Sequence, residues 1–160
     1  MRVESYGKSY GEPFGKDYLQ ERITAEFPLA RHIGIVVERA DDGGIVLSAP
    51  LAPNANDKGT AFGGSLFSVA VLTGWSWVAR YLDAAGIAAD AVIQESTIRY
   101  LRPVHGELHA ALVPPAAAEV AKFRKMLERA RRGRIRLDVH IDHAQAPVLE
   151  FTGIYAAAHR

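Results

Sequence analysis

The chain has 160 residues, 49% of them hydrophobic and 23% charged, which predicts one globular domain with a sizeable core. Because it contains no cysteine, disulfides, thiolate nucleophiles and cysteine-bearing zinc sites are excluded, and a reducing compartment is favoured. The N-terminus lacks the apolar segment of a secretory signal. We therefore expect a cytoplasmic protein with an N-terminal arm over residues 1–16 and a single domain over residues 17–160.

The first predicted elements are a helix and a β-hairpin. From Asp17 onward, Leu19 and Ile23 recur at helical spacing. Two runs rich in valine and isoleucine then flank an Asp-Asp-Gly-Gly turn, over residues 33–39 and 45–51. Such a pattern predicts two antiparallel strands.

A long buried helix follows. Between Lys58 and Arg80 lie twenty-one uncharged residues, of which nine are glycine, serine or threonine. That polar content argues against a membrane span, and the paired glycines place the start of the helix near Gly64. A helix that is apolar on nearly all sides lies inside a fold, so we expect the strands to surround it.

The second half predicts four more strands and one helix. Strands are expected over residues 91–102, 107–113, 134–142 and 148–158, and a basic amphipathic helix between Pro115 and Gly133. Strands joined by hairpins form an antiparallel sheet, whose apolar face the central helix would cover. A single curled sheet leaves an edge open, so we expect a homodimer or a dimer of dimers.

Three motifs resemble those of the hotdog-fold thioesterases, in the branch typified by the C-terminal domain of YiiD. They are residues 54–66 (NANDKGTAFGGSL), residues 98–104 (IRYLRPV) and residues 28–35 (PLARHIGI). The resemblance implies an α+β hotdog fold, an antiparallel sheet wrapped around a long central helix. It also implies dimers with a continuous sheet and hydrolysis of acyl-CoA or acyl-carrier-protein thioesters. Coenzyme A would then be part of the substrate, and we expect no other cofactor.

The resemblance has one departure that affects the chemistry. In the phenylacetyl-CoA type of hotdog thioesterase, a histidine precedes the glycine pair and an acid lies about two turns into the helix. Here Phe62 precedes Gly63, and the helix has no carboxylate before Asp83. The amides of Gly63, Gly64 and Ser65 remain candidates for polarising a thioester carbonyl, although the glycines also suit a tight loop.

Glu95 is the candidate base, because it is a carboxylate in an otherwise apolar strand. In a dimer this strand would reach the partner's helix start. The alternative is a surface carboxylate paired with Arg99 or Arg102. Strand alternation places Glu95 opposite Ile98 and Tyr100 unless a bulge changes the register.

The remaining candidates are polar residues near the glycines. The Asn56 amide is expected to orient water or bind the thioester, and we favour it over Asn54, although both also suit turns. Ser68 is a possible hydrogen-bond donor to the substrate, Ser96 a group that orients Glu95 or water, and Ser65 a helix cap.

Two further sets of residues concern substrate binding and metals. Phe62 is a candidate for lining an acyl site, and Arg131 and Arg132 for holding CoA phosphates. They belong to residues 122–136, whose local net charge of +7 favours an anionic partner, although such a face is often only solvated. The histidines at 140 and 143 lack a third partner, so no metal is expected.

Three other functions compete with a thioesterase. A non-catalytic acyl-CoA or lipid-binding protein would keep the glycine loop without a base. A hotdog dehydratase would need a histidine near the helix, and none lies between His32 and His105. A nucleic-acid module is disfavoured because the basic segment lacks interleaved aromatic residues beyond Phe123. We therefore expect an acyl thioesterase that acts without nucleic acid or membrane.

Overall fold

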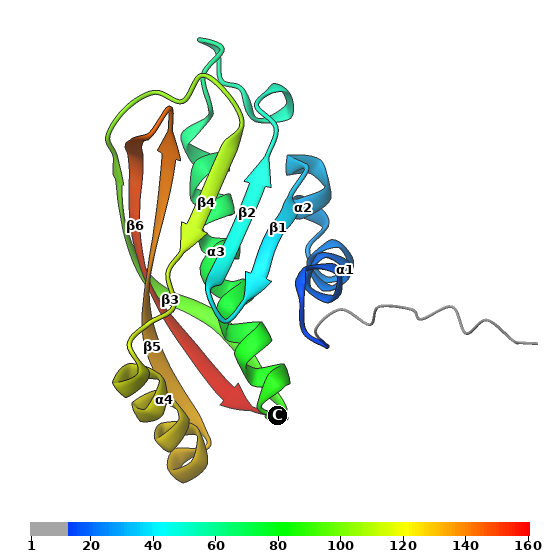
Figure 1. The fold of residues 1–160 in the computed structure, drawn as a ribbon, viewed down its shortest axis with the longest axis vertical. Helices are drawn as coiled ribbons and strands as arrows, with labels where there is room; N and C mark the ends of the chain where they lie inside the picture. The colour runs from blue at the N-terminus through cyan, green and yellow to red at the C-terminus, as the bar shows by residue number, and fades with distance from the viewer. Residues whose placement is uncertain (1–12) are drawn as a thin grey trace, which may run out of the picture.

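A computed structural model describes residues 13–160, so the arm predicted for residues 1–16 lies largely outside the described residues (Figure 1). The helices are α1 (Lys16–Glu26), α2 (Pro28–Ile33), the short 3-10 turn η1 (Ala52–Asn54), α3 (Gly63–Ala84) and α4 (Ala117–Ala130). The strands are β1 (Val36–Asp41), β2 (Gly44–Ala49), β3 (Ala89–Tyr100), β4 (Leu108–Leu112), β5 (Arg132–His143) and β6 (Ala146–His159). None of the described helices is long and apolar enough to span a membrane.

The six strands form one sheet in the order β1-β2-β4-β5-β6-β3, and every neighbouring pair is antiparallel. The sheet curves around α3, which packs against β2 to β6 (Figure 1). On β5, residues facing α3 are buried and alternate with exposed arginines on the outer face. The predicted α+β architecture, an antiparallel sheet around a long central helix, is confirmed.

The middle of α3 is the centre of the hydrophobic core. Val69, Ala70 and Val78 have no exposed surface. Across from them on β6, the buried Tyr155 hydroxyl donates a hydrogen bond of 2.8 Å to the Val71 carbonyl. A Cβ atom on Gly74 would lie 2.2 Å from that hydroxyl oxygen. Gly74 is therefore required by the close packing of α3 on β6.

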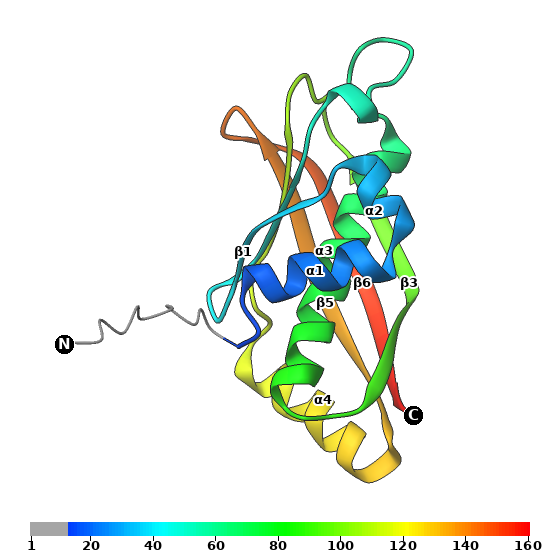
Figure 2. The ribbon, with the colours of Figure 1, turned by 90° about the vertical axis from the view of Figure 1, so that its right-hand side faces the viewer.

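Residues 28–33 differ from the prediction, because they form helix α2 before the hairpin begins. Pro28 occupies the first turn, where its missing N–H costs nothing, and Gly34 ends the helix with a left-handed φ of 79°. The strand predicted from residue 33 therefore begins at Val36. This short helix joins α1 to the sheet, and α1 crosses in front of α3 on the side away from the strands (Figure 2).

The two edges of the sheet are treated differently. At β1, the Gln20 side chain on α1 donates to the Ile35 carbonyl at 3.1 Å and accepts from the Val37 N–H at 2.7 Å. The amide thus imitates a neighbouring strand and occupies that edge. At the other edge, β3 is paired with β6 only, and no other described segment pairs with its twelve residues.

Candidate active site

The start of α3 combines free backbone donors with an open surface. Phe62 is the N-cap residue and makes no side-chain cap, and its ring is 57% exposed. No described group accepts a hydrogen bond from the N–H of Gly63, Gly64 or Ser65. Unpaired amides at a helix start attract negative charge, so this turn is suited to polarising a carbonyl oxygen.

The fold gives little reason for the glycine at 64. Neither Gly63 nor Gly64 has a positive φ. A Cβ on Gly63 would make only ordinary contacts with Tyr100 at 3.5 Å, and one on Gly64 would meet the exposed ring of Phe62, which has room to move. Glycine lowers helix propensity, so its presence here favours a role in which another molecule approaches the backbone.

The two asparagines before the glycines position the loop. Asn54 is 2% exposed, and its amide donates to the carbonyls of Ile33 and Pro50 at 2.8 and 2.7 Å. The backbone carbonyl of Asn54 accepts from the Phe62 N–H at 2.7 Å, so Asn54 ties α2 to the helix start. Sequence reasoning preferred Asn56 and missed this positioning role, because burial was not apparent from the sequence.

Asn56 is occupied within its own loop. Its side-chain oxygen accepts from the N–H groups of Lys58 and Thr60, and its amide donates to the Thr60 hydroxyl at 2.9 Å. These bonds form the turn that leads into α3. The geometry therefore favours the loop-forming role of Asn56 over direct contact with a substrate.

The polar side chains of the first helical turns point to local partners. The Ser68 hydroxyl donates to the Gly64 carbonyl at 2.8 Å, and Ser65 makes no cap bond. On β3, the Tyr100 hydroxyl donates to the Gly63 carbonyl at 3.1 Å. Tyr100 was not predicted as a site residue. It joins the end of β3 to the start of α3 because it lies on the inner face of the strand.

Glu95 lies on the outer face of β3, directly after a β-bulge, and opposite Ile98 and Tyr100 as strand alternation predicts. The register shifts between Ile93 and Glu95, so that Glu95 pairs with Ile154 while Ser96 pairs with the buried Gly153. Ser96 and Tyr100 therefore share the face toward α3, and Glu95 is exposed on the outer face. There it borders a hollow of about 420 Å³ with Arg136 and Thr152. The structure does not bring Glu95 together with the helix start of its own protomer.

The two predicted phosphate ligands differ in position. Arg131 ends α4 with a left-handed φ of 56° and its carbonyl accepts from the His159 N–H, whereas Arg132 begins β5 on the outer face. The end of α4 and the start of β5, which carry these two residues, lie near the end of α3 opposite to its start (Figure 1). Among the described residues, no group of three or more histidine, aspartate or glutamate side chains is placed to hold a metal.

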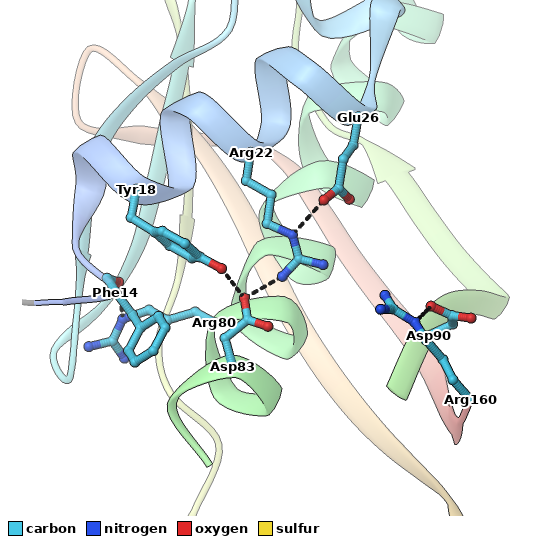
Figure 3. A network of polar contacts seen from close by, with 8 residues as sticks. All are labelled: Phe14, Tyr18, Arg22, Glu26, Arg80, Asp83, Asp90 and Arg160. Carbon is cyan, nitrogen blue, oxygen red and sulfur yellow. Dashed lines mark hydrogen bonds and ion pairs between the residues drawn. The ribbon is translucent and has the colours of Figure 1, made fainter. Parts of the chain in front are cut away.

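A second polar cluster lies at the other end of α3, under α1 (Figure 3). The Tyr18 hydroxyl donates to the Asp83 carboxylate at 2.6 Å, and Arg22 binds both Asp83 and Glu26. Burial and the neighbouring carboxylate of Asp83 raise the pKa of Tyr18. Arg22 also lies 5.2 Å above the Trp75 ring. Every group in this cluster has a partner, which is typical of a structural anchor rather than a reactive centre.

Comparison with known proteins identifies the family. The sequence profile of the family described as "Putative thioesterase (yiiD_Cterm)" matches residues 16–159. The chain belongs to this thioesterase family. That match covers the whole sheet and α3, including the glycine pair and its loop.

Solved structures agree with this assignment. A protein of unknown function from Chlorobaculum tepidum is 32% identical, with a TM-score of 0.86 over 91% of this chain and 94% of its own. A "putative thioesterase" from Shewanella oneidensis is 26% identical, with a TM-score of 0.77 over 91% of this chain and 97% of its own. The PaaI protein of Escherichia coli is 19% identical, with a TM-score of 0.61 over 91% of this chain and 93% of its own, a likeness of fold alone. The fold is the hotdog fold.

Proposed function

We propose that this protein is an acyl thioesterase that hydrolyses thioesters of coenzyme A or of an acyl carrier protein. The observation that carries the proposal is the start of α3, where unpaired amides and two glycines meet an open surface in a chain of the thioesterase family. A site of this kind suits a reaction in which negative charge develops on a carbonyl oxygen.

In the proposed reaction, the thioester carbonyl oxygen accepts hydrogen bonds from the Gly64 and Ser65 amides. Water attacks the carbonyl carbon and gives a tetrahedral oxyanion at the helix start, where the amides and the helix dipole stabilise it. Collapse of this intermediate breaks the C–S bond, and the thiol leaves with a proton derived from the water. Phe62, beside Gly64, would contact the acyl group, and Ser68 and Ser96 would border it.

The base is the part of the proposal on which sequence and geometry disagree. Glu95 is the carboxylate that the sequence pattern selects, but it faces away from α3. Pairing two β3 edges continues the sheet, so the outer face of one protomer remains an outer face beside its partner. From this geometry we expect Glu95→Gln to keep turnover within about threefold. A loss of about 10²-fold or more would establish Glu95 as the base.

We further propose that the site is completed by a homodimer formed through β3. This edge is twelve residues long, and the large exposed apolar residues include Val92 and Tyr100 on β3 and Phe62 beside it. An exposed edge of this length is a template for pairing with a second chain. An antiparallel two-fold pair would place Tyr100 and the helix start of one protomer next to the beginning of the partner strand.

The experiment is free-thiol release from short, long and aromatic acyl-CoAs and from acyl-carrier-protein thioesters, with light scattering to give the mass in solution. We expect saturable turnover by a particle of twice the chain mass. Absence of turnover with every ester, together with a rise in Tm on adding acyl-CoA, would replace the proposal with a non-catalytic acyl-CoA-binding protein. That alternative is favoured by one observation: no described carboxylate is bonded to residues 62–68.

A further inference from the structure

A groove of about 680 Å³ lies on the outer face of the sheet, between α4 and the first residues of β3 and β5. Its lining combines small or apolar side chains with two arginines, Gln94 and Asp90, and the Asp90 carboxylate is paired with Arg160 at 2.7 Å. The small, apolar and basic residues include Val92, Met126, Ala130, Ala156, Arg132 and Arg134. The alanines of β6 leave the floor open, and Met126 and Ala130 form one wall because they are four residues apart on α4. The hollow has the size of a small-molecule site.

The cations around this groove are largely uncompensated. Of the eight basic residues in 122–136, two form ion pairs with described residues, Arg124 with Glu128 at 2.9 Å and Arg136 with Asp138 at 3.3 Å. The other six form none among the described residues: Lys122, Lys125, Arg129, Arg131, Arg132 and Arg134. A site with unpaired cations beside an apolar hollow fits an anionic ligand that also has an apolar ring.

The arrangement of these cations follows the groove. On α4, Lys122 and Arg129 are not part of the lining but lie within roughly 60° of Met126 around the helix axis. Arg132 and Arg134 are two residues apart on β5 and so project from the same outer face, roughly 7 Å from each other. The helix dipole accounts for cations at the end of α4, but not for arginines on a strand.

We propose that this groove binds the nucleotide end of coenzyme A, with Arg132 and Arg134 contacting its phosphates and the apolar floor holding its adenine ring. The inference rests on the proposed thioester hydrolysis and selects coenzyme A over a carrier protein as the group that bears the acyl chain. A nucleotide fills a hollow of this size, whereas a stable protein partner needs an interface of about 1,000 Å² or more.

The position of the groove is consistent with a site shared between two protomers. Within one protomer, α4 lies at the opposite end of the molecule from the start of α3 (Figure 1). In the proposed dimer, the beginning of β3 lies beside the end of the partner strand and hence near the partner's helix start. Asp90 lines both the outer groove and the inner cavity of about 200 Å³ under Trp75. The pantetheine arm would pass around this end of β3.

The test compares two double variants that each remove two positive charges from the same segment. Arg132→Ala/Arg134→Ala removes the groove arginines, and Arg124→Ala/Lys125→Ala removes two cations of α4 that do not line the groove and lie roughly 160° and 100° from Met126 around the helix axis. Calorimetry with coenzyme A should show binding by the wild type and a loss of about tenfold or more in the groove variant. The control should stay within about twofold, and dephospho-coenzyme A should bind the wild type more weakly than coenzyme A.

Equal weakening in both double variants would reduce the effect to general charge attraction and overturn the proposal. So would an absence of coenzyme A binding to the wild type. Kinetics separate this inference from the proposed function: the groove variant should raise KM for acyl-CoA and leave KM for acyl-pantetheine unchanged. Coenzyme A binding with this pattern but no hydrolysis would contradict the proposed thioesterase activity and leave the groove proposal standing. Hydrolysis with an unaltered KM for acyl-CoA in the groove variant would contradict the groove proposal and leave the thioesterase activity standing.

Discussion

Two parts of α3, its first turn and the stretch from Gly74 to its end, use glycine for opposite purposes. At Gly74, a side chain on β6 fills the space that a Cβ would need, and the neighbouring Trp75 is covered by Phe27 and Arg22. At Gly64, the nearest atoms belong to the exposed Phe62 ring, and the amides of the first turn have no described partner. One glycine is explained by the fold. The other is explained only by something that comes to the helix from outside.

This contrast shows how a structural site is distinguished from a functional one. The C-terminal end of α3, here called the anchored end, has complete hydrogen bonding, because Tyr18, Arg22 and Asp83 are all paired. The open end keeps donors that the protein itself does not satisfy, at a cost in helix stability. Substitutions at the two ends should therefore separate activity from stability.

Gly64→Ala should have the largest effect, and on activity alone. The added methyl group would hinder the approach of a thioester to the amides, and we expect turnover to fall by about 10²-fold. The free energy of unfolding should be unchanged or slightly higher, because alanine is the better helix former. Thiol release and urea unfolding measure the two quantities. Ser65→Ala is the matched control, since it keeps the backbone amide and should keep activity.

Gly74→Ala should instead lower stability. Its Cβ would clash with the buried Tyr155 ring, and overpacking of this kind costs about 1–3 kcal/mol. The combination with Tyr155→Leu should be less damaging than the sum of the two single changes, because the clash is removed. Strict additivity in urea unfolding would show that the two residues do not oppose each other in this way.

The features that could be predicted from the sequence are those that local interactions determine. The long helix and the alternating strand at β5 follow from hydrophobic period, and the sheet around α3 was expected from the order of the elements. Alternation along β3 already places Glu95 opposite Ile98 and Tyr100. The bulge at residues 93–95 was not predictable, because it depends on pairing with β6, and it puts Ile93 on the inner face. The glycine pair was found from the sequence. The anchoring roles of Asn54 and Gln20 were not, since each bonds a backbone group distant along the chain.

The Tyr155 hydroxyl, which packs against the middle of α3, should make stability sensitive to alkaline pH. Burial raises the pKa of Tyr155 well above the value of about 10 expected in the unfolded chain. Above pH 10 the unfolded chain therefore loses this proton first, so stability falls as pH rises, by about 1.4 kcal/mol at pH 11. Tyr155→Phe should cost about 1 kcal/mol at pH 7 through its lost hydrogen bond. The gap between variant and wild type should close by pH 11, and a gap that stays constant in urea unfolding would contradict this account.

Asp83→Asn should have the smallest effect and is the sharpest test of the anchored end. The substitution keeps the shape but removes the charge that Arg22 and Tyr18 share, in a cluster whose side chains are partly exposed. Solvent screening limits such a pair, so we expect a loss of about 0.5–1 kcal/mol that shrinks as salt is added. Because the Asp83 carboxylate is already bonded by Arg22 and Tyr18, kcat should remain that of the wild type. A fall in kcat without a fall in Tm would instead place Asp83 in the chemistry and remove the distinction between the two ends of the helix.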